Sequence, residues 1–288
     1  ERHGISIEEV PASSGQEFAS ALATEQIQVA TGVPNAALFN ALNRGINIRI
    51  VADFAHLGDA KDTTLSLMVR KDLIDSGAVK TPADLKGRSL SIGPSGPGEI
   101  PDVLFTRIFD PLGITHKDMQ LEYLGFANVL AAFTSKALDS GFEVEPLVQA
   151  GERRNIARVL VPGGAVDPGG ELSVVYYSPA FAKNRNAATR FMVAYLQGIR
   201  DYYAAFFLGK DKDATIKLLI EHLPLKDPKV WATSRQFTDL NGKVNVADLK
   251  YQAGVYKRLG MISGNVPDID NYVDPQFADA AVKEIGKR

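Results

Sequence analysis

Residues 27–53 read IQVATGVPNAALFNALNRGINIRIVAD and alternate a strand, a helix and a second strand. The strand-like run at 27–29 is interrupted before Pro34, which suits the first turn of a helix. That helix ends at Gly45, and residues 46–50 then alternate apolar and polar side chains, which is typical of a strand. The order of these elements predicts an α/β fold with a largely parallel sheet.

The rest of the chain continues this alternation before it becomes mainly helical. A strand is expected over residues 5–10, and residues 191–206 carry apolar side chains three and four positions apart, as in a buried helix. Further strand-like runs lie at 65–69, 90–92, 121–124, 157–161 and 172–177. Strands that alternate with helices favour the α/β class over all-helical or all-β proteins.

Two stretches rich in charge or glycine, 70–87 and 162–171, bracket the middle of the chain. The simplest architecture is a discontinuous first lobe, residues 1–82 and 177–288, interrupted by a second lobe, residues 83–176. Two connecting strands would then form a hinge and leave a cleft between the lobes. Because open α/β sheets bind ligands at the carboxyl ends of their strands, loops of both lobes are expected to face that cleft.

Composition excludes several classes of function. The 288 residues include 32 basic and 34 acidic ones without a basic block, so a nucleic-acid partner is not expected. No apolar run approaches the roughly 18 residues of a membrane span. The absence of cysteine excludes disulfides, thiolate metal sites and a cysteine nucleophile within this sequence. No histidines pair at metal-ligand spacing, and residues 93–98 lack the ending of a phosphate-binding loop, so we expect neither a metal nor a cofactor.

Polar residues suited to ligand binding follow several of the predicted strands. Some of these loops precede helices, where free amides and the helix dipole favour an oxygen-rich or anionic group. Glycine lets a ligand approach the backbone, and serine, threonine and asparagine add hydrogen bonds. Taken singly, each loop is equally typical of an ordinary cap or turn. The loops are 13–15, 31–35, 53–56, 95–99, 125–128 and 143–145.

Individual side chains in these loops leave the chemistry of the ligand open. Core packing is the default role of Phe54 and Tyr176, although an aromatic ring that faced the cleft would stack on a planar ligand. A structural role is the default for His56. Acidic residues such as Asp53 and Glu145 favour a neutral or hydrogen-bond-donating ligand, whereas helix N-termini favour a sulfonate or carboxylate.

Three stretches, in order along the chain, resemble the periplasmic solute-binding proteins of the nitrate, sulfonate and thiamine-pyrimidine-precursor group, which are subunits of ABC importers. Each motif alone is loose, but their order is fairly specific and the similarity spans nearly the whole chain. The matching stretches are His3-Gly4-Ile5 through Arg44-Gly45, LMVRKDL and ADLKG within 67–87, and Gly125-Phe126, AAF and Glu145-Pro146 within 125–146; VDPQF at 273–277 also fits.

The resemblance implies a type II periplasmic-binding fold, with two α/β lobes joined by a two-stranded hinge, and a location in the periplasm or at the extracytoplasmic surface. It implies a small organic solute as ligand and a membrane permease as partner, and we expect a monomer. Members of the group carry a further strand and helix before the segment that matches residues 1–4, and part of the site is expected on that strand. The expected ligand-binding residues are Ser14, Gly15, Thr31, Asn35, Asp53, Phe54, Ser95, Gly96, Asn128, Glu145 and Tyr176.

Two alternatives to solute transport stay open. One is an enzyme on the same fold that acts on a small heterocyclic or organosulfur substrate, and the other is a ligand-sensing module. The relatives with this fold that act as enzymes rely on cysteine, which the chain lacks, so we expect no catalytic residue.

Overall fold

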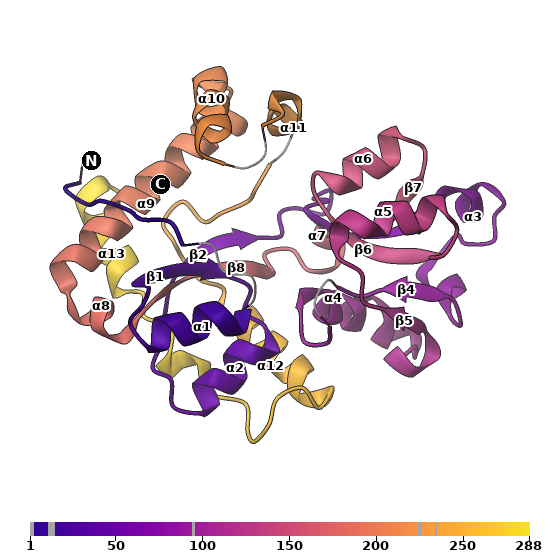
Figure 1. The fold of residues 1–288 in the computed structure, drawn as a ribbon, viewed down its shortest axis with the longest axis horizontal. Helices are drawn as coiled ribbons and strands as arrows, with labels where there is room; N and C mark the ends of the chain where they lie inside the picture. The colour runs from indigo at the N-terminus through magenta and orange to yellow at the C-terminus, as the bar shows by residue number, and fades with distance from the viewer. Residues whose placement is uncertain (1–2, 11–14, 94–95, 224–225, 234) are drawn as a thin grey trace.

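The protein forms two lobes, each built round one β-sheet (Figure 1). The computed structural model describes residues 3–10, 15–93, 96–223, 226–233 and 235–288. The sheet of lobe 1 has the order β1 (Val29–Gly32), β8 (Glu171–Tyr177), β2 (Arg49–His56). The sheet of lobe 2 has the order β5 (Gln120–Glu122), β4 (Ser89–Ser91), β6 (Ser140–Val144), β3 (Leu65–Arg70), β7 (Ala157–Pro162).

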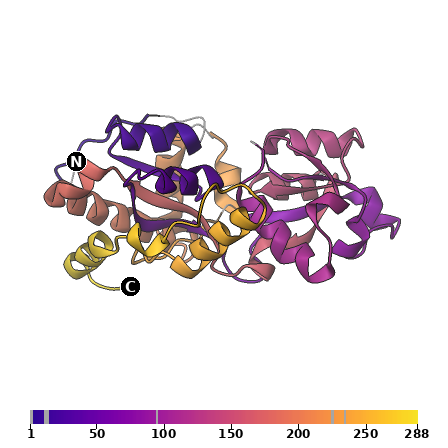
Figure 2. The same ribbon diagram turned by 90° about the horizontal axis from the view of Figure 1, so that it is seen from below.

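Helices cover both faces of the sheet of lobe 1. Because side chains alternate along a strand, Tyr176 and Tyr177 of β8 enter the cores on opposite faces. The helices are α1 (Gly15–Ala23), α2 (Ala36–Asn43) and α12 (Val246–Arg258) on the Tyr176 face, and α9 (Arg185–Phe206) and α13 (Gln276–Ile285) on the Tyr177 face. The two ends of the chain therefore share one lobe, and the middle of the chain forms the other (Figure 2).

Lobe 2 has the same three-layer arrangement. Phe142 of β6 packs with α4 (Ile100–Phe109) on one face, and Met68 of β3 packs with α5 (Phe126–Thr134) and α6 (Leu147–Arg153) on the other. The remaining elements are α3 (Lys71–Asp75), α7 (Gly163–Val166), α8 (Pro179–Lys183), α10 (Lys212–His222), α11 (Pro228–Thr233), η1 (Pro82–Leu85), η2 (Asp110–Leu112), η3 (His116–Asp118) and η4 (Ile269–Asn271). Of these, α10 and α11 project from lobe 1 (Figure 1).

Two segments cross between the sheets, residues 57–64 after β2 and residues 163–170 before β8. They lie side by side and are joined by a hydrogen bond from the Leu57 amide to the Gly170 carbonyl at 2.9 Å. The two crossings, of which the second begins with α7, together form a short double connection between the lobes, as expected for a hinge.

At both crossings the chain passes from one lobe to the other earlier in the sequence than the expected boundaries at 82/83 and 176/177. β3 already belongs to the sheet of lobe 2, and β8 already belongs to the sheet of lobe 1. A buried apolar strand has the same pattern in either sheet, so periodicity does not assign it. We propose that lobe 1 comprises residues 3–56 and 171–288 and that lobe 2 comprises residues 65–162.

The sheets are less parallel than predicted. Within the described residues, the three strands of the lobe 1 sheet pair antiparallel with one another, and β2 has one parallel bridge, from Ile50 to Val273. In lobe 2 the parallel pairs are β4–β5 and β4–β6. The reason is that β8 enters lobe 1 from a crossing and runs against both neighbours. The strand predicted over 5–10 does not form, and Ile7 and Val10 are 65% and 62% exposed. Alternating apolar residues make a strand only where a neighbouring strand supplies hydrogen bonds.

The second crossing depends on the absence of a side chain at Gly164. A Cβ atom there would lie 2.0 Å from the carbonyl oxygen of Asp59 in the first crossing. Gly164→Ala is therefore expected to lower the free energy of unfolding by roughly 1–3 kcal/mol, measured by urea denaturation. Gly198→Ala is the control, because Gly198 is exposed on α9 and a Cβ there meets nothing within 4 Å, and we expect a gain of up to about 1 kcal/mol. Equal changes in both variants would show that the close approach is absent.

Candidate functional site

Strand ends of the two lobes define the candidate site. In lobe 1, β1 and β2 both pair antiparallel with β8, so they end at the same edge of the sheet, where β8 begins. In lobe 2, β4 pairs parallel with β5 and β6, so these three strands also end at one edge. Within the described residues, the loops that follow are 33–35 in lobe 1 and 92–93, 96–99, 123–125 and 145–146 in lobe 2. We call these two edges, with their loops and the first turns of the helices that follow, the interlobe junction.

Two hydrogen bonds join the lobes at the junction. The Ala36 amide donates to the Gly98 carbonyl at 2.9 Å, and Nδ2 of Asn35 donates to Oε1 of Glu99 at 3.3 Å. Gly98 permits this contact, because a Cβ atom there would lie 2.7 Å from the Ala36 Cβ. The first turn of α2 in lobe 1 therefore lies against the loop that leads into α4 in lobe 2.

Helix capping positions Asn35 and Glu99. Asn35 is the N-cap of α2, and its Oδ1 accepts from the Leu38 amide at 3.0 Å. Glu99 is the N-cap of α4, where Oδ2 of Asp102 accepts from the amides of Gly98 at 2.7 Å and of Glu99 at 3.3 Å. Burial raises the pKa of Glu99 above its usual value, and the hydrogen bond from Asn35 opposes that rise. Both helix N-termini are thus capped by side chains of the protein itself.

A second contact between the lobes centres on Arg107 of α4. Its Nε lies 2.8 Å from Oδ2 of Asp167 in the second crossing, and its Nη2 lies 2.7 Å from Oδ1 of Asp248 on α12. The guanidinium also lies over the Tyr251 ring, 3.9 Å from its centre. Burial, helped by the Asp248 carboxylate and opposed by Arg107, raises the pKa of Asp167 to about 7. The Arg107 guanidinium therefore forms ion pairs with two buried carboxyl groups, one from lobe 1 and one from the second crossing.

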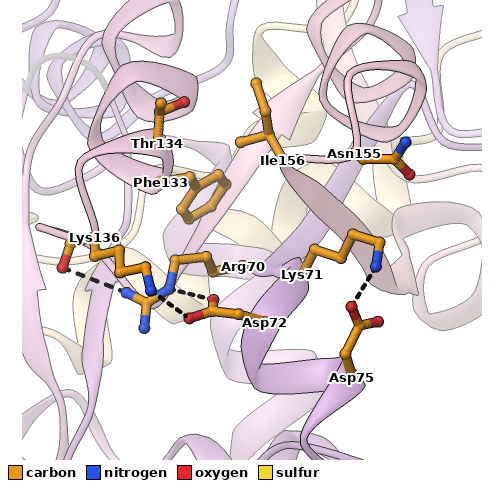
Figure 3. A pocket seen from close by; sticks show the side chains of 9 residues that line it. All are labelled: Arg70, Lys71, Asp72, Asp75, Phe133, Thr134, Lys136, Asn155 and Ile156. Atoms are coloured by element: carbon orange, nitrogen blue, oxygen red, sulfur yellow. Dashed lines mark hydrogen bonds and ion pairs between the residues drawn. The ribbon is translucent and has the colours of Figure 1, made fainter.

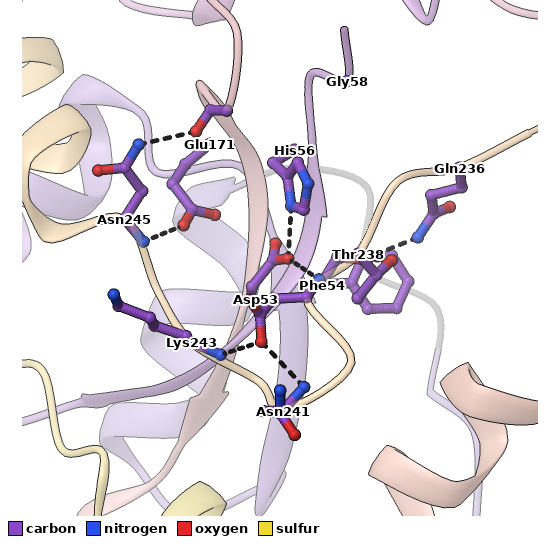
Figure 4. A network of polar contacts seen from close by, with 12 residues as sticks. Asp53, Phe54, His56, Gly58, Glu171, Gln236, Thr238, Asn241, Lys243 and Asn245 are labelled. Carbon is purple, nitrogen blue, oxygen red and sulfur yellow. Dashed lines mark hydrogen bonds and ion pairs between the residues drawn. The ribbon is translucent and has the colours of Figure 1, made fainter. Parts of the chain in front are cut away.

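Asp53, His56 and Glu171 form a polar network where the crossings leave lobe 1 (Figure 4). Oδ2 of Asp53 accepts from Nδ1 of His56 at 2.7 Å and from the Asp239 amide at 2.6 Å. Burial opposes protonation of His56, but the hydrogen bond and charge of Asp53 raise its pKa above the usual value. Burial and the Asp53 carboxylate raise the pKa of Glu171 to about 10. Asp53 Oδ1 and Glu171 Oε2 have no donor within the described residues, which fits a proton shared between the two carboxyl groups.

The end of β6 carries two further carboxyl groups. Glu145 is half-buried, and its Oε1 accepts from the Thr63 hydroxyl at 2.7 Å. Glu143 is fully buried and stands opposite Ser66 in the register of β3 and β6. Glu143 Oε2 and Ser66 Oγ have no hydrogen-bond partner within the described part of the chain. Burial raises the pKa of Glu143 to about 8, so this edge of lobe 2 holds a carboxyl group that is protonated near neutral pH.

The structure brings part of the predicted site together. The junction contains Asn35, Gly96, Asn128 and Glu145. Asp53 lies in the polar network at the same edge of lobe 1 as Asn35. Gly15 begins α1, and Thr31 is exposed on β1. Ser14 and Ser95 lie outside the described residues.

Two predicted aromatic contacts pack inside lobe 1. Phe54 stacks on Tyr195 of α9 with ring centres 6.5 Å apart. Tyr176 is fully buried and stacks on Phe18 of α1 with ring centres 5.4 Å apart. Both rings contribute to the core of lobe 1, and a role for either in ligand stacking stays a prediction.

Sequence reasoning missed Arg107 and Glu171. The partners of Arg107 lie far away along the chain, in the second crossing and on α12, so no local pattern marks it. The available signal for Glu171 is weak, namely a charged residue that opens an otherwise apolar strand.

A separate pocket lies at the outer end of lobe 2 (Figure 3). Its volume is about 620 Å³, and its lining is Arg70, Lys71, Asp72, Asp75, Phe133, Thr134, Lys136, Asn155 and Ile156. Arg70 lies 2.6 Å and Lys136 3.5 Å from Asp72, and Lys71 pairs with Asp75. Because each of its three cations already has a carboxylate partner, the pocket is a weaker candidate than the junction.

The described residues contain no group of three or more histidine, aspartate and glutamate side chains arranged to hold a metal ion. In the same part of the chain, no helix combines the length and the apolar character that crossing a bilayer requires.

A profile of the NMT1/THI5-like family matches residues 1–205. The chain belongs to this family. Its solved structural neighbours have the periplasmic-binding fold, with two α/β lobes, as predicted. No curated protein matches the sequence.

Three of these neighbours are named as binding proteins for small anions or anionic compounds. The NMT1/THI5-like chain is 20% identical to the periplasmic aliphatic sulphonate binding protein SsuA from Escherichia coli, with a TM-score of 0.70, over 90% of this chain and 84% of that one. It is 19% identical to the alkanesulfonate-binding protein SsuA from Xanthomonas axonopodis pv. citri bound to MOPS (TM-score 0.65, 91% and 85% covered). It is 12% identical to the periplasmic nitrate-binding protein NrtA from Synechocystis PCC 6803 (TM-score 0.68, 96% and 80% covered).

Replacing Arg107 tests the buried contact between the lobes. Arg107→Met keeps the apolar stem but leaves two buried carboxyl groups without a cation, so we expect a loss of about 3 kcal/mol in the free energy of unfolding. The control is Arg258→Met, which breaks the exposed pair with Asp110 between the same two helices and is expected to cost less than about 1 kcal/mol. Urea denaturation of both variants measures the difference, and equal losses would contradict the importance of burial.

The Asp167 carboxyl makes stability depend on pH. Because its pKa is raised above the unfolded value of 3.8 to about 7, the native protein keeps a proton that the unfolded chain releases. This contribution is complete below about pH 4 and is lost as the pH rises through about 7. Asp167→Asn is expected to flatten the fall of unfolding free energy over that range, measured by denaturation at several pH values. Asp118→Asn is the control: the pKa of Asp118 is lowered to about 2, so its stabilising contribution is constant near neutral pH and is lost only as the pH falls toward 2. An unchanged slope in Asp167→Asn would refute the assignment.

Proposed function

We propose that this NMT1/THI5-like protein is the substrate-binding subunit of an ABC importer and that it captures a small organic solute between its lobes. The observation that carries the proposal is the interlobe junction, where strand ends of both sheets meet and two paired crossings connect the lobes. Open α/β sheets bind ligands at the carboxyl ends of their strands. The sulfonate- and nitrate-binding proteins with this fold support the same conclusion.

Capture requires the lobes to separate and close again about residues 57–64 and 163–170. The polar contacts that opening would break are Ala36–Gly98, Asn35–Glu99, Arg107–Asp248 and Arg258–Asp110. The exposed Arg258–Asp110 pair contributes little to stability, so it permits opening. The buried Arg107 pair favours the closed form more strongly. A closed solute-binding protein would then present both lobes to a membrane permease and release the solute unchanged.

The lobes can be locked together without touching the junction loops. Arg258 on α12 and Asp110 after α4 pair at 3.1 Å across the lobes and are exposed, and the chain has no cysteine of its own. A short bismaleimide bridge in the Asp110→Cys/Arg258→Cys variant should lower the rate of ligand association at least about 100-fold, because a closed site admits no solute.

The matched control bridges two positions within lobe 1. Lys250, also on α12, pairs with Asp270 at 2.6 Å, and both are exposed. The bridged Lys250→Cys/Asp270→Cys variant is expected to bind at the rate of the unbridged protein, measured by stopped-flow fluorescence. Unchanged association in the bridged 110/258 variant would exclude entry between the lobes.

A solute panel identifies the ligand for these measurements. Sulfonates, nitrate, pyrimidines, flavins, aromatic acids and small amines would be screened by thermal shift and confirmed by calorimetry. A solute at 100 times its dissociation constant stabilises the folded state by about 2.7 kcal/mol, which raises the melting temperature measurably. No hit across the whole panel would count against solute binding.

An enzyme on the same fold is the second candidate, and the Asp53–His56 pair is the observation that favours it. A buried carboxylate that accepts from one imidazole nitrogen is the arrangement of a general base. Incubation with any identified solute distinguishes the two functions, since a transport protein returns the solute unaltered and an enzyme converts it in molar excess. We further propose a monomer located outside the cytoplasmic membrane, which equilibrium sedimentation and cell fractionation would test.

A further inference from the structure

The loops of the interlobe junction contain no basic residue. The segments 31–35, 92–99, 123–128 and 144–146 hold neither lysine nor arginine. Two basic residues lie close by in the sequence: His56 in the polar network has its Nδ1 committed to Asp53 at 2.7 Å, and Lys61 in the first crossing is exposed. Arg107, like His56, is committed, to Asp167 and Asp248. These four segments therefore supply no free cation of the kind with which proteins commonly neutralise a bound anion.

The N-termini of two helices at the junction, α2 and α4, are also occupied, whereas α5 has no side-chain cap at Gly125. Asp102 accepts from the amides of Gly98 and Glu99 at the start of α4, and Asn35 accepts from the Leu38 amide at the start of α2. These are the amides that would otherwise bind an oxyanion. Side-chain oxygen atoms of the protein already accept hydrogen bonds from these amides, where a bound anion would otherwise do so.

Carboxyl groups at the junction have no cationic partner. Glu99, Glu143, Glu145 and Glu171 form no ion pair within the described residues, although none of them is fully exposed. Glu99 hydrogen-bonds to Asn35, and Glu145 hydrogen-bonds to Thr63, which are both neutral. Buried carboxyl groups ordinarily have a cation or remain protonated, because an isolated buried charge is costly.

Glu143 gives a second, independent indication that a hydrogen-bond donor from a ligand belongs at this edge of lobe 2. It is 0% exposed, and its Oε2 has no hydrogen-bond partner in the described part of the chain. The Glu145 amide continues the ladder of β6 by donating to the Thr64 carbonyl at 3.0 Å, so Glu143 and Glu145 lie two residues apart on the same face. The unpartnered oxygen thus belongs to the same side of the sheet as a carboxyl group that reaches the junction.

We propose that the solute bound at the junction is a small organic cation whose charge lies on nitrogen, as in an ammonium or amidinium group, and that Glu99, Glu145 and Glu143 provide the complementary charge. This inference rests on the proposed solute-binding function and names its ligand class. It separates this chain from the sulfonate- and nitrate-binding proteins that share its fold. An N–H donor satisfies carboxylate oxygens directly, whereas a sulfonate would face several carboxyl groups without a counter-charge.

Binding of a cation at the junction is expected to release a proton. Burial raises the pKa of Glu143 to about 8, so this carboxyl is largely neutral at pH 7. The groups next to it are the Val144 amide, at 2.9 Å, and Ser66 in the opposing strand position, neither of which is charged. Glu99 faces Asn35, Asp102 and Tyr256, and burial also raises its pKa. A bound cation favours the ionised carboxylate, so its affinity rises between about pH 6 and pH 8, whereas the affinity of an anion falls.

Matched probes of opposite charge test the ligand class. Calorimetry would compare benzylammonium with benzenesulfonate, butylammonium with butanesulfonate, and guanidinium with nitrate, each pair similar in size and shape. We expect measurable binding of at least one cation and none of its anionic counterpart, with protons released in buffers of different ionisation enthalpy. Affinity that increases with pH is the second expected result.

Neutral variants connect that binding to the named residues. Glu99→Gln and Glu145→Gln are each expected to weaken cation binding at least about 10-fold, which is 1.4 kcal/mol. Glu143→Gln keeps the size of the side chain and is expected to abolish the proton release. Glu284→Gln, exposed on α13 far from the junction, is the control and should bind like the unaltered protein.

The outcomes separate this inference from the proposed function. Binding of a sulfonate or nitrate alone, or cation binding that survives Glu99→Gln and Glu145→Gln, would overturn the ligand class and leave solute capture intact. Binding of only uncharged members of the wider panel would overturn it as well. Failure of the entire panel, including all six probes, would overturn both.

Discussion

The ion pairs of Arg107 are the interaction on which the arrangement of the two lobes depends. A single guanidinium on α4 of lobe 2 contacts Asp248 on α12 of lobe 1 and Asp167 in the second crossing. Asp248 also accepts from the amide of Glu171 at 2.8 Å, so the same cation is linked to the start of β8. Because both carboxyl groups are buried, the geometry of α4, α12 and the crossing is coupled: moving one element leaves a charge unpaired.

The use of that cation in a structural role determines the electrostatics of the junction. The nearby glutamates Glu99, Glu143 and Glu145 form no ion pair within the described residues, and the N-termini of α2 and α4 are capped by Asn35 and Asp102. Related solved structures keep the fold at 12–20% identity, so the two-lobed scaffold is compatible with very different loops. The sheets hold the strand ends in place, and we propose that the side chains that follow each strand select the ligand.

Much of the secondary structure was predictable because it depends on local pattern. The helix at 36–43 follows from Pro34 and Gly45 at its two ends, and the buried strands at 65–70 and 171–177 follow from their apolar runs. The strand expected at 5–10 was wrong, since its apolar residues have no neighbouring strand to pair with. The predicted parallel sheet was also wrong for lobe 1, because the direction of β8 depends on how the chain returns from lobe 2.

The amino-acid sequence by itself determined the α/β class, the family, the absence of thiol chemistry and the polar loops after the strands. These properties depend on composition, periodicity and residues that are near one another in the chain. Only the tertiary structure decided that Arg107 lies between two carboxyl groups, that Asp53 and Glu171 share one site, and that Glu143 is buried without a partner. The physical reason is that burial and charge pairing arise between segments far apart in sequence, and their energies depend on distances that no linear pattern records.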